Sequence, residues 1–236
     1  MKKFILLTFV IVLSVGLNSC SKESSNTSNI IVYQVPVDIA ARYITMAFCN
    51  ASAGINLHIE NAATFTSLGK GSFDSTFTIK KLDSAAAVKY QYQVEYTLAR
   101  QTSPSQVTFD YTAGGSFSSS VLQSADEQDG TWVFTTLAQS QLTMNGSGTD
   151  GGNQNDVVDK VQFTSQFIYT LQNVMIDKTT DMIASGSATI TINGAGPADV
   201  HFNYSGTLTF SGNRQAVLVL GGSTFNFSLL TGNYTK

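Results

Sequence analysis

The sequence predicts a mainly β protein. Its expected core is a single large antiparallel sheet, curved or closing into a barrel-like meander, with one or two N-terminal helices packed on or inside it. Three observations predict this fold. Apolar and polar residues alternate over much of the chain after Gly71, turn-forming pairs separate many of these runs, and one stretch before Gly71 has helical spacing instead.

The helical stretch lies between Val37 and Ala53. Its apolar residues recur every three or four positions, at Ala40, Tyr43, Ile44, Ala47, Phe48 and Ala51. Pro36 suits the start of this helix and Gly54 suits its end. Residues 55–68 fit either a second helix or a strand, because their apolar residues satisfy both spacings, and we expect a helix there.

The strands are predicted from period-two alternation. The clearest run has Tyr90, Tyr92, Val94, Tyr96 and Leu98 on one side and polar residues on the other. Similar runs recur as far as Leu229, and their spacing predicts eight to eleven antiparallel strands. The turn signals between the runs are Asn145-Gly146, Asp150-Gly151-Gly152, Asn193-Gly194, Ser211-Gly212-Asn213 and Gly221-Gly222. Since one-sided strands must bury their apolar faces, a curved sheet with a helix in its concave face is the expected arrangement.

Residues 1–19 have the layout of a secretory signal peptide, with two lysines followed by an apolar run. The segment Leu17-Asn18-Ser19-Cys20 resembles the lipobox of bacterial lipoproteins, in which diacylglycerol is attached to the thiol. That resemblance implies that Cys20 is the lipidated first residue of the mature chain and anchors it to a membrane. An ordinary secretory signal followed by an incidental cysteine is the alternative.

Residues 20–30 are polar and are expected to form a tether, leaving residues 31–236 as a single β-rich domain. Lys22-Glu23 is similar to the start of the export signal that sends some Bacteroidota lipoproteins to the cell surface. The expected location is therefore the outer membrane, lipid-anchored and facing either the periplasm or the cell surface.

The composition bears on nucleic-acid binding and on the state of the Cys49 thiol. Without Lys2 and Lys3 the mature chain has 11 basic residues against 16 acidic ones, so we expect no nucleic-acid partner. If Cys20 is lipidated, Cys49 has no disulfide partner, and core packing is its expected role. Trp132 is likewise expected in the core, whereas His58 and His201 are expected on the surface.

No catalytic or metal-binding constellation stands out. Residues 126–130 and 150–156 are rich in Asp, Asn, Gln and Gly, but the second group lacks the spacing and closing glutamate of an EF-hand, so a hairpin loop is expected there. The serines show no Gly-x-Ser-x-Gly motif. We therefore predict a non-enzymatic protein without a metal or other cofactor.

Two short motifs suggest a modification. Asp74-Ser75-Thr76 and Asp83-Ser84-Ala85 resemble the sites at which Bacteroidota attach O-glycans, which implies O-glycosylation of Ser75 and Ser84. The general plan of lipobox, polar tether, short helix and β meander also resembles uncharacterised lipoproteins of Bacteroidota. That resemblance implies no particular activity.

The leading functional hypothesis is a binding protein of the cell envelope that holds a hydrophobic or amphipathic small molecule in the concave face of its sheet. Its basis is the density of aromatic residues, 15 Phe and 9 Tyr. The alternative is a structural or adhesive surface module that binds protein or glycan, with the aromatic residues serving only as core. A hydrolase would need a cleft holding a titratable group with a shifted pKa.

Overall fold

The computed structural model describes residues 34–68, 73–84, 87–103 and 105–236. It confirms the predicted fold class: eleven antiparallel strands follow one another in sequence order, and two N-terminal helices pack against the sheet they form. The first and last strands are not paired with each other, so the sheet is open. The predicted signal peptide, Cys20 and the predicted tether lie outside the described residues.

The elements have the following bounds. The helices are α1 (Val37–Phe48), a 3-10 turn η1 (Asn50–Ser52), α2 (Ile55–Leu68) and a second 3-10 turn η2 (Pro197–Asp199). The strands are β1 (Phe73–Asp83), β2 (Lys89–Thr102), β3 (Ser105–Ser118), β4 (Leu122–Thr135), β5 (Gln141–Asp156), β6 (Val161–Asp177), β7 (Met182–Ala195), β8 (His201–Gly212), β9 (Gln215–Leu220), β10 (Ser223–Ser228) and β11 (Tyr234–Thr235).

The two helices are joined by a tight turn. Helix α1 begins after Pro36, as predicted, but ends at Phe48, earlier than the pattern suggested, because the chain turns through η1 and Ala53 adopts a left-handed conformation with φ of 58°. Gly54 follows, where an added Cβ would lie 2.1 Å from the carbonyl oxygen of Ala47. Only glycine can lie this close to the carbonyl oxygen, because it has no Cβ. The turn thereby fixes the direction of α2 relative to α1.

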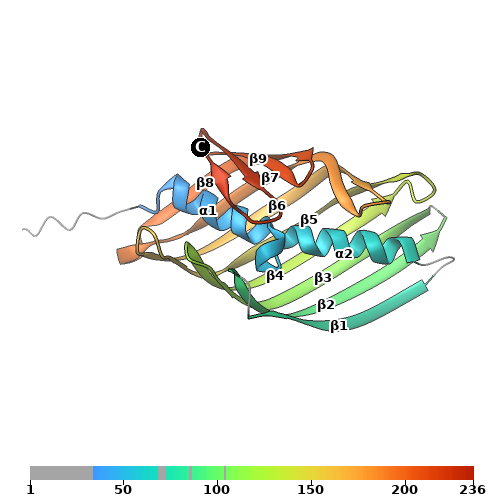
Figure 1. Cartoon of the computed structure of the whole chain (residues 1–236), viewed down its shortest axis with the longest axis horizontal. Helices are drawn as coiled ribbons and strands as arrows, with labels where there is room; N and C mark the ends of the chain where they lie inside the picture. The colour runs from blue at the N-terminus through green and yellow to red at the C-terminus, as the bar shows by residue number, and fades with distance from the viewer. Residues whose placement is uncertain (1–33, 69–72, 85–86, 104) are drawn as a thin grey trace, which may run out of the picture. The chain divides into compact units, whose positions relative to one another are not determined.

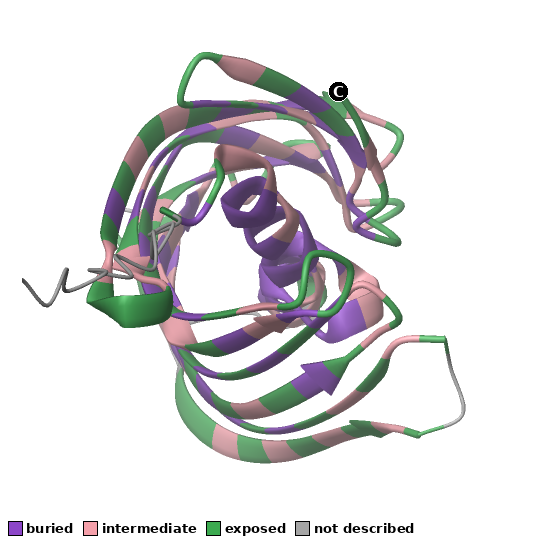
Figure 2. Cartoon of the chain, turned by 90° about the vertical axis from the view of Figure 1, so that its left-hand side faces the viewer, coloured by how far each residue is buried: buried purple, intermediate pink, exposed green. Residues whose placement is uncertain are grey.

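The sheet curls around both helices, which lie in its concave face (Figures 1 and 2). Burial alternates along the strands because one side of the sheet faces the helices and the other faces solvent. The largest side chains of the core come from the concave face and α1: Trp132, Tyr43, Tyr92, Tyr96, Tyr111, Tyr169, Phe48, Phe109, Phe134, Phe167, Phe225 and Phe227. Cys49 and Trp132 are buried as predicted.

One end of the sheet carries the turns β1–β2, β3–β4, β5–β6 and β7–β8, and helix α1 begins there (Figure 1). The first described residue, Gln34, lies at the same end, beside His201 and Ala195. The hydroxyl of Tyr204 fixes the chain here by donating to the carbonyl oxygen of Val35 at 2.8 Å. We call this the α1 end of the sheet.

Three of the predicted turns are wrong. Asn145-Gly146 and Asp150-Gly151-Gly152 lie inside β5, and Asn193-Gly194 lies inside β7. The glycines serve packing instead of chain reversal, because bulky neighbours lie against their backbone. At Gly146, for example, an added Cβ would be 2.8 Å from Cδ1 of the Trp132 ring. The strands are consequently longer than the turn signals implied.

Candidate functional site

The structure tests the predicted site residues only in part. Cys20 lies outside the described residues. Ser75 is exposed within β1 and Ser84 is exposed just after it, so both hydroxyls are accessible and O-glycosylation stays a prediction. His201 is exposed as expected. The surface position predicted for His58 is wrong, because its side chain is fully buried.

A band of buried polar side chains crosses the concave face beneath α1. We call it the polar stripe, and it consists of Ser124, Asp126, Gln128, Asp150, Gln154, Asp156 and Ser165. The residues come from inward positions of β4, β5 and β6. Within the stripe, Ser165 donates to Gln154 at 3.0 Å, and Gln154 donates to Ser124 at 3.4 Å. The loop predicted for the acid-rich segments is therefore wrong.

Two carboxyl groups form the centre of the polar stripe. Asp126 and Asp150 lie on neighbouring strands, with Gln128 directly opposite Asp150 in the register. Each carboxyl accepts one tyrosine hydrogen bond: Tyr43 of α1 donates to Asp150 at 2.8 Å, and Tyr92 of β2 donates to Asp126 at 2.6 Å. The second oxygen of each carboxyl has no donor among the described residues.

Burial determines the protonation of this pair. It raises the pKa of Asp150 well above its ordinary value, and the neighbouring charge of Asp126 raises it further. Burial also raises the pKa of Asp126. Two buried carboxylates on neighbouring strands would be very costly without a cation, and protonation of one of them removes one of the charges. We therefore regard the pair as a proton-binding site of the folded chain.

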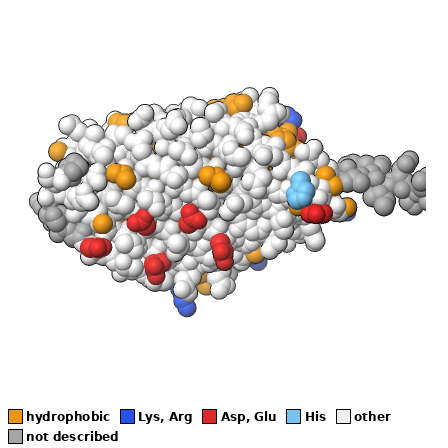
Figure 3. Space-filling view, turned by 180° about the vertical axis from the view of Figure 1, so that it is seen from behind, with side chains coloured by type: hydrophobic (Ala, Val, Ile, Leu, Met, Phe, Trp, Pro, Cys, Tyr) orange, Lys and Arg blue, Asp and Glu red, His pale blue; other side chains and the backbone are white. Residues whose placement is uncertain are grey.

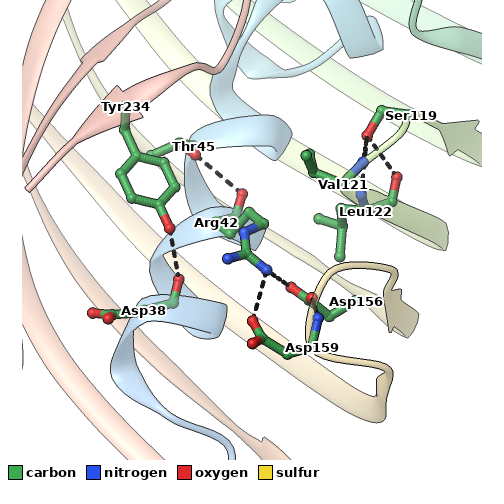
Figure 4. A network of polar contacts seen from close by, with 9 residues as sticks. All are labelled: Asp38, Arg42, Thr45, Ser119, Val121, Leu122, Asp156, Asp159 and Tyr234. Carbon is green, nitrogen blue, oxygen red and sulfur yellow. Dashed lines mark hydrogen bonds and ion pairs between the residues drawn. The ribbon is translucent and has the colours of Figure 1, made fainter.

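A third carboxyl of the stripe is paired with an arginine. Arg42 of α1 contacts Asp156, which is fully buried, and Asp159 at 3.1 Å in the β5–β6 turn (Figure 4). Asp156 also accepts the backbone N–H of Asp159 at 2.8 Å. On the other side of α1, Tyr234 donates to the carbonyl oxygen of Asp38 at 3.4 Å. Helix α1 is thus held by polar contacts to both halves of the sheet.

Beneath α2 the concave face is aromatic. His58 stacks on Tyr111 with ring centroids 4.6 Å apart, and its Nδ1 is 2.7 Å from the hydroxyl of Tyr96. Phe109 stacks on Trp132 at 5.6 Å with nearly parallel planes. Burial lowers the pKa of His58 to about 3, so this imidazole is neutral at physiological pH. Nothing in the arrangement presents it to solvent as an acid or base.

An apolar pocket of about 500 Å³ opens at the α1 end, between the two edges of the open sheet. Met46 and Ala51 form its floor at the end of α1, while its walls come from the β1–β2 and β3–β4 turns and the β10–β11 loop. The apolar wall residues are Val88, Tyr90, Val121 and Leu230. Pockets of 300–1,000 Å³ with mostly apolar linings are typical of small-molecule sites. We call this the seam pocket.

The convex face is different in character. It carries hydroxyl and amide side chains in rows across the strands, and shallow hollows of about 780 and 810 Å³ cross it. Acidic side chains gather on one part of this face (Figure 3). Glu95, Glu127 and Asp129 line one of the hollows. No aromatic ring lines that hollow.

Within residues 34–236, apart from the short undescribed gaps, no three His, Cys, Asp or Glu side chains come together in a way that could hold a metal ion. The described helices are too short or too polar to cross a bilayer. No protein-family model matches the chain, and neither curated proteins nor solved structures gave a significant match.

Proposed function

We propose that the chain is a lipid-anchored protein of the cell envelope that binds a hydrophobic or amphipathic small molecule without chemically changing it. Helices α1 and α2 cover the centre of the concave face, so the proposal places the ligand at the end of that face, in the seam pocket. The observation that carries it is the apolar lining of this pocket at an open end of the sheet. Its volume suits part of an acyl chain or a ring system of similar size.

The polar atoms of the seam pocket support an amphipathic ligand. Hydroxyl and amide groups surround the apolar lining, and they come from Asn50, Ser119, Ser120, Thr231 and Asn233. A few polar groups around an apolar pocket orient a ligand that has one polar end. The charged residue of the lining is acidic, Asp83, so an acyl chain with a small neutral headgroup fits this surface better than a sugar or a nucleotide.

Ligand binding can be tested with cis-parinaric acid, a fluorescent acyl chain, titrated into the chain purified without detergent. We expect saturable binding that Leu230→Asp weakens at least tenfold, because the substitution puts a charge on the pocket wall. The matched control is Val219→Asp, which places the same charge at an exposed valine of β9, outside the pocket. Equal weakening by both variants, or binding that never saturates, would contradict the proposal.

The anchor needs a separate test. The chain isolated from its native membrane should have the mass of residues 20–236 plus acyl groups, and Cys20→Ser should abolish both that added mass and partition into detergent. An unmodified mass starting at Cys20 would contradict lipid anchoring.

The second candidate is a structural or adhesive module that binds protein or glycan through its convex face. The hollowed, hydroxyl-rich surface of that face favours it. The two candidates differ in one measurable respect. A convex-face partner would be lost on substituting Glu127 and Asp129, and these changes would leave the binding of cis-parinaric acid unaffected.

A further inference from the structure

The exposed large apolar side chains are unevenly distributed over the described surface. Two of them, Ile168 and Val219, are isolated on the convex face. The others lie at the α1 end, and we call them the apolar rim: Leu82 (66% exposed), Val157 (37%), Val158 (56%) and Leu230 (44%). Single exposed apolar residues are ordinary, whereas a group at one end of a molecule marks a contact surface.

The rim borders the opening of the seam pocket at Leu230 and beside Val121. The backbone N–H of Val157 donates to the carbonyl oxygen of Val121 at 3.0 Å, which places the β5–β6 turn beside the β3–β4 turn. Val121 and Leu230 line the pocket together. Leu82 lies opposite Gln91 in the register, on the convex side of the edge strand β1. An object that covers the rim would therefore also face the pocket opening.

The position of the first described residue indicates which surface covers the rim. Gln34 lies at the α1 end, and only 13 residues separate it from Cys20. An extended segment of that length reaches at most about 45 Å, so a lipid on Cys20 keeps the domain close to the bilayer. Because that segment joins the described domain at Gln34, the α1 end is the one to which the proposed tether connects.

We infer that the apolar rim docks on the surface of the lipid bilayer, with the seam pocket opening toward the lipid. This rests on the proposed lipid anchor. Charged side chains at this end have both signs, since Lys89, Lys160 and Lys236 lie on the same end as Asp38 and Asp159. The contact is therefore apolar, and salt should have little effect on it. A bound lipid could enter the pocket from the membrane without crossing water.

The test uses the full mature chain reconstituted into vesicles of phosphatidylethanolamine and phosphatidylglycerol. An environment-sensitive fluorophore is attached at Val158→Cys, with Ile168→Cys as the matched control; Cys49 is buried and is not labelled under native conditions. We expect the emission of the label at position 158 to rise at least twofold and shift to the blue in vesicles. The label at position 168 should not change.

The outcomes separate the rim from the anchor. If the chain carries its acyl mass but the label at position 158 stays water-like, the rim inference is overturned and the anchor stands. If the acyl mass is absent, the anchor is wrong, and adding vesicles to that chain tests the rim alone: a rise supports docking and no rise overturns it. A response that needs membrane proteins would identify a protein partner instead and also overturn the inference.

Discussion

The concave face differs beneath its two helices. Under α2 the contacts are between rings, with His58, Tyr96 and Tyr111 in direct contact. Under α1 the sheet presents the polar stripe, and Tyr43 and Arg42 reach into it. Ring packing stabilises mainly through the large area that it buries, whereas buried hydrogen bonds lose most of their value if the geometry changes. The comparison suggests that the α2 region supplies stability and that the polar stripe fixes the position of α1.

The largest effect should come from the aromatic region. Replacing Trp132 by Ala removes a fully buried ring that stacks on Phe109, and we expect a loss of about 3–5 kcal/mol in the free energy of unfolding. Urea unfolding followed by circular dichroism measures this, since the single tryptophan is lost as a fluorescence probe. A loss below about 1 kcal/mol would show that the α2 region does not dominate stability.

In the α1 region the largest effect should come from Arg42→Ala. The substitution leaves the buried carboxylate of Asp156 with the N–H of Asp159 as its remaining contact, and we expect a loss of about 2–3 kcal/mol. Lys236→Ala is the matched control, because it breaks an exposed ion pair on the same helix, with Asp38, and should cost less than about 0.5 kcal/mol. Equal effects of the two variants would show that burial of Asp156 has no energetic role.

The two regions should respond to pH in opposite directions. His58 has a lowered pKa, about 3, so its contribution to stability is present above about pH 6.5 and is lost as the pH falls. Asp150 has a raised pKa, so its contribution is present below about pH 4 and is lost as the pH rises. Between these values the two effects oppose each other, so in the parent chain each partly offsets the other.

Asp150→Asn removes the opposing titration, so the contribution of His58 to the pH dependence of stability should become measurable. The free energy of unfolding should then rise with pH between pH 4 and 6.5, with a slope of up to about 1.4 kcal/mol per unit. His58→Gln should give a falling free energy over the same range. Urea titrations at several pH values measure both slopes. Slopes of the same sign in the two variants would refute the assignment of opposite titrations to the two regions.

The sequence predicted the meander, both helices and the burial of Cys49 and Trp132, because these depend on apolar spacing that is visible in the chain. It did not predict the polar stripe, because Asp, Asn and Gly also form turns. A usable signal was nevertheless present. Leu122, Trp132 and Phe134 share one parity, and that parity places Asp126 and Gln128 on the inward side of the same strand.

The misplacement of His58 has a similar cause. Its position lies three residues after Ile55 and one before Ile59, on the buried face of α2. The absence of metal-ligand spacing says nothing about burial, so it was a poor basis for expecting a surface residue. The open edges of the sheet and the seam pocket depend on strand twist and on contacts between distant turns, which alternation does not encode.

The smallest effect tests whether the polar stripe positions α1. Tyr43→Phe removes the hydroxyl that donates a hydrogen bond to Asp150, and it should lower the free energy of unfolding by about 1–2 kcal/mol. The control is Tyr204→Phe, which removes a hydrogen bond to Val35 at a half-buried site and should cost less. Urea unfolding of the two variants measures the difference.

A double-mutant cycle makes this test sharper. Tyr43 and Tyr92 do not donate to the same carboxyl, so their losses would simply add if Asp126 and Asp150 were independent. If the protonation of Asp126 and Asp150 is coupled, removing one tyrosine hydroxyl changes the charge on the carboxyl group to which the other tyrosine donates. The double Phe variant should then depart from additivity by at least about 0.5 kcal/mol, whereas the pair Tyr43→Phe and Tyr204→Phe should remain additive. Additivity in both cycles would mean that the carboxyl groups titrate separately, and α1 would then be held by two unconnected contacts instead of one coupled site.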